Sequence, residues 1–146
     1  MNSALGEQIA TFPVESYSYQ AFTDVFTAIR THQWPSGSVE LRVAVYNAGA
    51  GIRKGFLDVT ERDIQTVVDA NINGAFAFSH QVVAEFKKNE LDGKGKRGTL
   101  IFTGATASLR GNVTTSIFSA GKFALRALSQ SLNKEFGKEN IHVRSD

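Results

Sequence analysis

The chain has 146 residues, of which 42% are hydrophobic and 21% are charged, which is the composition of one globular domain spanning residues 1–146. Sixteen Lys and Arg residues against fourteen Asp and Glu residues leave a net charge of +2, and this balance argues against a dedicated nucleic-acid-binding protein. The absence of cysteine excludes a disulfide framework, a thiolate nucleophile and a cysteine-ligated metal site.

Two further classes of protein are disfavoured by the sequence. The three histidines, His32, His80 and His142, are scattered without the spacing of metal ligands, so we expect no metal site. No apolar run approaches the roughly 18–20 residues that span a bilayer, and the first residues lack the charged and apolar regions of a secretory signal. We therefore expect a cytoplasmic protein that binds neither nucleic acid nor a membrane.

The first third of the chain alternates between short apolar runs and a helical pattern. Residues 9–14 are predicted to form a short strand that ends near Pro13. Apolar side chains then recur at helical spacing and predict an amphipathic helix over residues 19–31. The apolar, β-rich residues 41–46 predict a parallel strand buried on both faces, and a glycine-rich turn follows them over residues 47–55.

The central part of the chain is predicted to be one long helix. Thr60 and Asp63 have the spacing of a capping box, and apolar residues continue at helical spacing to about residue 88. The polar loop over residues 87–98 carries five basic side chains, and a solvated helix–strand connection is favoured there over a nucleic-acid or membrane patch.

The last third repeats the same alternation. Residues 99–103 are predicted to be a strand, residues 116–137 a second long helix, and residues 141–143 a further strand. Strands that alternate with helices in this way indicate an α/β domain with a parallel sheet. In such sheets, ligands bind outside the carboxyl ends of the strands, so the loops after residues 46 and 103 are where a site is expected.

Four short segments stand at or near these loops. They are Asn47-Ala48-Gly49 after one strand, Asn71-Ile72-Asn73-Gly74 on the long helix, Thr103-Gly104-Ala105 after the next strand, and Phe118-Ser119-Ala120-Gly121-Lys122 at the start of the last helix. In this order and spacing they resemble the middle of a short-chain dehydrogenase/reductase. The resemblance covers residues 8–144 approximately. It implies a partial Rossmann-like, doubly wound parallel sheet that lacks the first two strands and the last strand of the family.

The resemblance also implies site residues and a cofactor, NAD or NADP. Asn47, Ala48 and Gly49 match the element that steadies the central sheet beside the dinucleotide, although Tyr46 replaces its first asparagine. Asn71 matches the helix asparagine that holds a water in the proton relay. Lys122 matches the lysine that bonds the nicotinamide ribose and lowers the pKa of the catalytic tyrosine. Glu15 is aligned with an acidic residue that the family often has near the adenine.

Two positions depart from the family pattern. Phe118 stands four residues before Lys122, where the family has its general-acid tyrosine, and Ala105 stands where the substrate-orienting serine is expected. Phenylalanine has no proton to give to the oxygen of a carbonyl that receives a hydride. General acid–base assistance is worth about 10²–10⁴-fold in rate, so the usual reaction should be impaired.

The resemblance also covers only the middle of the family fold. The glycine-rich loop that receives the pyrophosphate at a helix N-terminus has no counterpart before Ile9. In the strand order of the fold, the strand over residues 41–46 would then have an unpaired edge. We therefore expect an internal fragment of the family fold.

Three functions follow as hypotheses. The preferred one is a short-chain dehydrogenase/reductase-like protein, related to NAD(P)-dependent oxidoreductases of carbonyl and alcohol groups, that is catalytically impaired or incomplete. The second is an active oxidoreductase with an altered proton-transfer route. The third is a non-catalytic binding or oligomerisation module that pairs its two long helices, residues 61–88 and 116–137, in a homo-oligomer. Taken singly, Asn71 could also be an internally bonded asparagine and Lys122 a solvated helix lysine.

Overall fold

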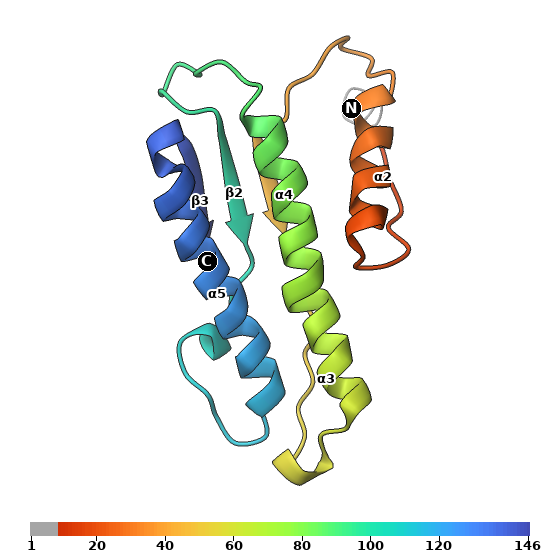
Figure 1. Ribbon diagram of the computed structural model, residues 1–146, viewed down its shortest axis with the longest axis vertical. Helices are drawn as coiled ribbons and strands as arrows, with labels where there is room; N and C mark the ends of the chain where they lie inside the picture. Colours follow the sequence, from red (N-terminus) through yellow and green to blue (C-terminus); the bar gives the residue numbers. More distant parts are fainter. Residues whose placement is uncertain (1–8) are drawn as a thin grey trace, which may run out of the picture.

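Helices and strands alternate along the part of the chain that the computed structural model describes, residues 9–146. They are α2 (Tyr19–Thr31), β1 (Val43–Tyr46), α3 (Glu61–Val68), α4 (Gly74–Phe86), β2 (Gly98–Phe102), α5 (Ser116–Phe136) and β3 (Ile141–Ser145) (Figure 1). A π-helical turn, Asp69–Asn73, joins α3 to α4 without a break. Helix α2 has the predicted bounds, and the strands and helices predicted after it form within two residues of their expected ends.

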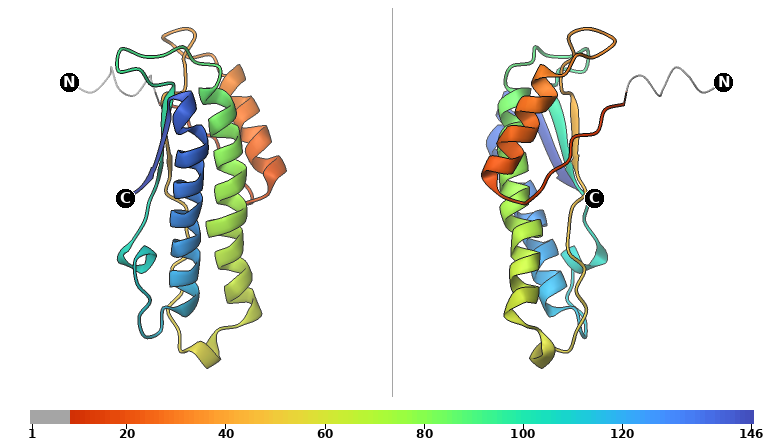
Figure 2. Two further views of the ribbon diagram at one scale, coloured as in Figure 1. Left: turned by 60° about the vertical axis from the view of Figure 1, so that its left-hand side comes forward. Right: turned by 90° about the vertical axis from the view of Figure 1, so that its right-hand side faces the viewer.

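The three strands form a parallel sheet in the order β1-β2-β3, with Val43 opposite Thr99 and Gly98 opposite Ile141. In the described residues, helices α2, α4 and α5 all lie over the same face of this sheet (Figure 2). Side chains therefore alternate between a buried and an open face along β1, where Ala44 is 7% exposed and Val45 is 52% exposed. This arrangement confirms the α/β fold class and the partial Rossmann-like sheet.

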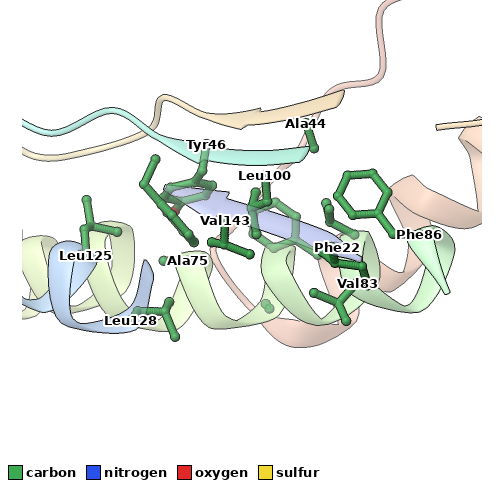
Figure 3. Close-up of a cluster of buried hydrophobic side chains, with 14 of the residues drawn as sticks. Phe22, Ala44, Tyr46, Ala75, Val83, Phe86, Leu100, Leu125, Leu128 and Val143 are labelled. Carbon is green, nitrogen blue, oxygen red and sulfur yellow. The ribbon is translucent and has the colours of Figure 1, made fainter. Parts of the chain in front are cut away.

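The hydrophobic core lies between the sheet and the helices (Figure 3). Leu100 and Phe102 of β2, with Phe86 of α4 and Leu125 of α5, are fully buried members of this core. The backbone of β2 passes so close to α4 that a Cβ added at Gly98 would lie 2.4 Å from the ring of Phe86. Full burial of each large apolar side chain contributes about 1.5–3 kcal/mol, so this layer fixes α4 and α5 on the sheet.

The predicted long helix begins as the sequence indicates. Thr60 and Asp63 form a reciprocal capping box, and Lys54 adds an ion pair of 2.7 Å to the Asp63 carboxylate. These contacts hold the pKa of Asp63 at about 2, and the hydrogen bond from Lys54 is the largest cause. The helix differs from the prediction in the middle, where the π-helical turn interrupts the regular spacing.

The predicted strand over residues 9–14 is wrong. These residues run as extended chain without pairing to the sheet, and among the described residues β1 has a strand neighbour on one side only, β2. Pro13 has no N–H to donate to a ladder. The ring of Phe12 instead packs 5.5 Å from His32 and 6.3 Å from Trp34, beyond the end of α2.

Candidate functional site

The loops after β1 and β2 meet the first half of α5 at the carboxyl ends of the parallel strands. The side chain of Lys122 reaches from α5 to the end of β2, where its Nζ donates a hydrogen bond of 2.7 Å to the carbonyl of Thr103. Because this edge is where parallel α/β sheets bind ligands, Lys122 stands at the expected place for a functional site.

Lys122 is unusually buried for a lysine, with 7% of the residue exposed. Burial lowers the pKa of its ammonium below the ordinary value of 10.5, since the charged form loses water. The ammonium has three N–H donors and gives one to Thr103. Among residues 9–146, Thr103 is the one hydrogen-bond acceptor of this Nζ, which leaves donors for an acceptor that enters this edge of the sheet.

Gly49 brings the first loop next to Lys122 and Asn71. A Cβ added at Gly49 would lie 3.5 Å from Lys122 Nζ and 3.6 Å from Asn71 Oδ1. Three of the residues singled out in the sequence, from three different segments, are therefore gathered at one point.

Asn71 is held within the π-helical turn and is 1% exposed. Its Oδ1 accepts a hydrogen bond of 3.1 Å from the backbone N–H of Ala50. Its Nδ2 has no hydrogen-bond partner among the described residues. On the side of α5, a Cβ at Gly121 would lie 2.7 Å from this Nδ2, so the helix approaches Asn71 as closely as glycine permits.

Phe118 lies one helical turn before Lys122 on α5, half-buried. A Cβ at Gly51 would lie 3.9 Å from its ring, and the guanidinium of Arg53 lies 5.9 Å from the ring centroid. The position thus presents an aromatic ring to the same loop that contacts Lys122. It offers no hydroxyl there.

The position of the expected serine also lacks a hydroxyl. Ala105 is exposed after β2, and its backbone N–H donates to the hydroxyl of Ser108 at 3.1 Å. The nearby hydroxyl of Ser119 donates to Thr115 Oγ1, which in turn donates to the carbonyl of Asn112. These hydroxyls are therefore engaged in local contacts.

The remaining predicted site residues are more peripheral. Asn47 is exposed, and Ala48 packs its methyl group against the hydrophobic core. Glu15 is exposed on the extended chain before α2. Within residues 9–146, no hydrogen bond or ion pair joins Glu15 to Lys122 or Asn71.

Tyr46 makes a buried contact that the sequence does not predict. Its ring is 3% exposed, and its phenol donates a hydrogen bond of 2.5 Å to the carbonyl of Ala70 in the π-helical turn. Burial raises the pKa of Tyr46 above its usual range, with a smaller contribution from Tyr17. The only sequence signal for this contact is the tyrosine itself, in place of a family asparagine.

The described part of the chain contains no group of three or more His, Asp or Glu side chains placed to hold a metal ion. None of its helices is both long enough and apolar enough to cross a bilayer.

Comparisons with known proteins agree on one family. Residues 1–145 match the family model for short chain dehydrogenase. The chain is 30% identical over 129 residues to a short-chain dehydrogenase/reductase of Armillaria gallica, covering 85% of this chain and 47% of the relative. It is also 30% identical over 125 residues to the human 3-hydroxyacyl-CoA dehydrogenase type-2, covering 82% and 48% respectively.

Solved structures show the same similarity. A short-chain dehydrogenase from Rhodopseudomonas palustris superimposes with a TM-score of 0.73 at 29% identity, over 88% of this chain and 55% of that one. A structure from Novosphingobium aromaticivorans has a TM-score of 0.81 at 20% identity, over 96% and 50%, and shows the fold alone. The chain thus spans about half the length of the curated relatives it matches.

Proposed function

Because the chain belongs to the short-chain dehydrogenase family, we propose that its site accepts the nicotinamide ribose of NAD or NADP at Lys122 but is impaired in carbonyl–alcohol redox chemistry. The observation that supports both halves of this proposal is the arrangement on α5. Lys122 is buried beside Asn71 and Gly49, while Phe118 occupies the same helix face one turn earlier.

The residues present fit the nicotinamide side of the cofactor. In the described part of the chain, Lys122 gives one of its three N–H donors to Thr103, and the other two suit the hydroxyl groups of a ribose. Gly49, next to this ammonium, has no side chain to obstruct them. The Oδ1 of Asn71 lies on the Gly49 side of the site, and its buried Nδ2, near Gly121, has no acceptor among the described residues. When bound, a reduced dinucleotide would supply the hydride, and these side chains would orient it.

The proton is the part of the reaction for which we find no donor. A carbonyl that accepts a hydride becomes an alkoxide, which needs an acid near neutral pH. A phenol beside a buried ammonium could serve, because the ammonium lowers the pKa of the phenol. Phe118 has no such group, and the phenol of Tyr46 is committed to the carbonyl of Ala70. We therefore propose that this chain retains dinucleotide binding but is impaired in carbonyl–alcohol redox catalysis.

A titration of the full chain with NADH and with NADPH tests the binding half. We expect saturable binding that weakens by at least about tenfold in Lys122→Met, which removes a charge-assisted hydrogen bond while retaining the aliphatic stem. Lys134→Met is the matched control, because Lys134 is exposed at the far end of the same helix. Equal affinities of the two variants would contradict the role of Lys122, and rapid turnover of a carbonyl panel would contradict the impairment.

A second function, self-association through the two long helices, is favoured by the groove between α4 and α5. This groove has a volume of about 350 Å³, and its apolar lining includes Phe76, Val83, Leu132 and Phe136. Phe76 is 58% exposed, which is high for a large apolar side chain. The partner we propose is a second copy of this chain, since the family commonly pairs these helices across subunits.

Sedimentation of the full chain tests this second function. We expect a dimer that dissociates in Phe76→Glu, because the carboxylate would lose its water in an apolar interface. Phe56→Glu is the control, since Phe56 is 76% exposed in the loop before α3, outside the groove. A monomer in the unmodified chain, or the same dimer in both variants, would contradict it.

A further inference from the structure

The hydrogen bond between Tyr46 and Ala70 links the end of β1 to the π-helical turn that holds Asn71. Tyr46 Oη lies 2.5 Å from the carbonyl oxygen of Ala70. Both residues are nearly fully buried, at 3% and 2% exposed. The bond therefore connects the central sheet to the residue that directly precedes Asn71 in the chain.

The π-helical turn is a local departure from the helical ladder that needs support. Such turns place one extra residue in the helix and are found frequently at functional sites. On its outer side, the carboxylate of Asp69 accepts hydrogen bonds from the side chains of Gln65 and Asn73. Among the described side chains, the phenol of Tyr46 is the one that donates a hydrogen bond to a backbone carbonyl of the turn.

Gly74 provides the space that this contact requires. A Cβ at Gly74 would lie 2.5 Å from Tyr46 Oη and 2.5 Å from the ring of Tyr17. Any larger residue would displace the phenol. The glycine at the start of α4 and the tyrosine at the end of β1 therefore fit one another.

We propose that Tyr46 is a positioning residue, whose phenol holds the π-helical turn so that Asn71 Oδ1 meets the N–H of Ala50. The chain of contacts runs from Tyr46 to the Ala70 carbonyl, to Asn71, and to the loop that carries Gly49 next to Lys122. That the placed asparagine serves a dinucleotide site rests on the proposed function; the placement itself does not.

The alternative is that Tyr46 serves only as a packing residue. Its ring lies 5.3 Å from that of Phe78 and 6.1 Å from that of Phe102, so it fills the core as well. Phenylalanine would preserve this packing and remove the hydroxyl alone. Tyr46→Phe therefore separates the two roles.

Native-state hydrogen exchange of the full chain, followed by NMR, provides the measurement. In Tyr46→Phe we expect the N–H of Ala50 to exchange about tenfold faster or more relative to the N–H of Leu100 in β2, because the buried carbonyl of Ala70 loses its donor and the turn opens locally. Tyr19→Phe is the control, since the Tyr19 hydroxyl contacts His80 at an exposed position away from the turn. There, the ratio should stay within about twofold of the unmodified chain.

An unchanged ratio in Tyr46→Phe, or a uniform acceleration that includes Leu100, would overturn the proposal and leave packing as the role of Tyr46.

If that variant fails to fold, hydrogen exchange in the unmodified chain provides the test. The N–H of Gly74 closes the π-helical turn by donating to the Asp69 carbonyl. We expect it to exchange through the same opening as the N–H of Ala50, so the two exchange rates should depend on denaturant in the same way. Different dependences would overturn it. No dinucleotide is present in these measurements, so their outcome is separate from that of the cofactor titration.

Discussion

Gly121 and Asn71 approach each other so closely that a Cβ on Gly121 would lie 2.7 Å from Asn71 Nδ2 and 2.5 Å from Val67 Cγ1. Helix α5 therefore packs on the α3–α4 helix with backbone against side chain at this point. The contact fixes the distance between the two elements that carry Asn71 and Lys122.

Gly121→Ala should destabilise the chain by about 1–3 kcal/mol, because the added methyl overpacks a buried helix contact. Urea denaturation measures the change in the free energy of unfolding. Gly137→Ala is the control, since a Cβ at Gly137 would have no neighbour within 4 Å and its φ of −58° suits alanine. A Gly121→Ala chain as stable as the control would show that the helices separate at little cost.

The burial of Lys122 predicts a pH dependence of stability with a defined sign. The folded-state pKa is lower than the ordinary 10.5, so the unfolded chain binds more protons at any pH between the two values. The free energy of unfolding contributed by Lys122 should therefore rise with pH across that window and be constant below it.

This contribution is isolated by subtracting the unfolding free energy of Lys122→Met from that of the unmodified chain at each pH. We expect the difference to grow in favour of the unmodified chain as the pH rises from neutral towards 10.5. The same subtraction with the exposed Lys134→Met should give a flat line. A difference that falls with pH would mean that a neighbouring charge, rather than desolvation, governs Lys122.

The cap at Thr60 predicts a separate effect on the helix that carries Asn71. The Thr60 hydroxyl accepts from the backbone N–H of Asp63, so Thr60→Ala should cost about 0.5–2 kcal/mol in unfolding free energy. Thr60→Ser keeps the acceptor oxygen and should cost less than half as much. Thermal denaturation of the two variants compares them directly, and equal losses would assign the effect to the methyl group of threonine.

Much of this architecture was predictable because local sequence patterns carry it. The helical spacing of residues 19–31, the capping pair at Thr60 and Asp63, and the apolar strand residues after residue 40 all predicted the right elements. The meeting of Gly49, Asn71 and Lys122 followed from the family spacing of the segments, which the structure then brings together.

Other features depend on contacts between distant residues and left little trace in the sequence. The π-helical turn contains no glycine or proline that would mark an irregular helix, and the phenol that contacts it comes from a strand residue 24 positions earlier. Residues 9–14 have the composition of a strand, yet a strand also needs a neighbour to pair with. The chain forms aromatic contacts at Phe12 in its place.

The proposed impairment rests on two side chains, Phe118 in place of a phenol and Ala105 in place of a hydroxyl. The direct measurement is stereospecific deuteride transfer from labelled NADH or NADPH to a panel of carbonyl compounds, comparing the unmodified chain with the Phe118→Tyr, Ala105→Ser double variant at saturating dinucleotide. We predict transfer at least about 100-fold faster in the double variant, in line with the value of general acid catalysis. Rates within tenfold of each other would contradict the proposed impairment, because restoring the phenol and the hydroxyl would then not restore hydride transfer.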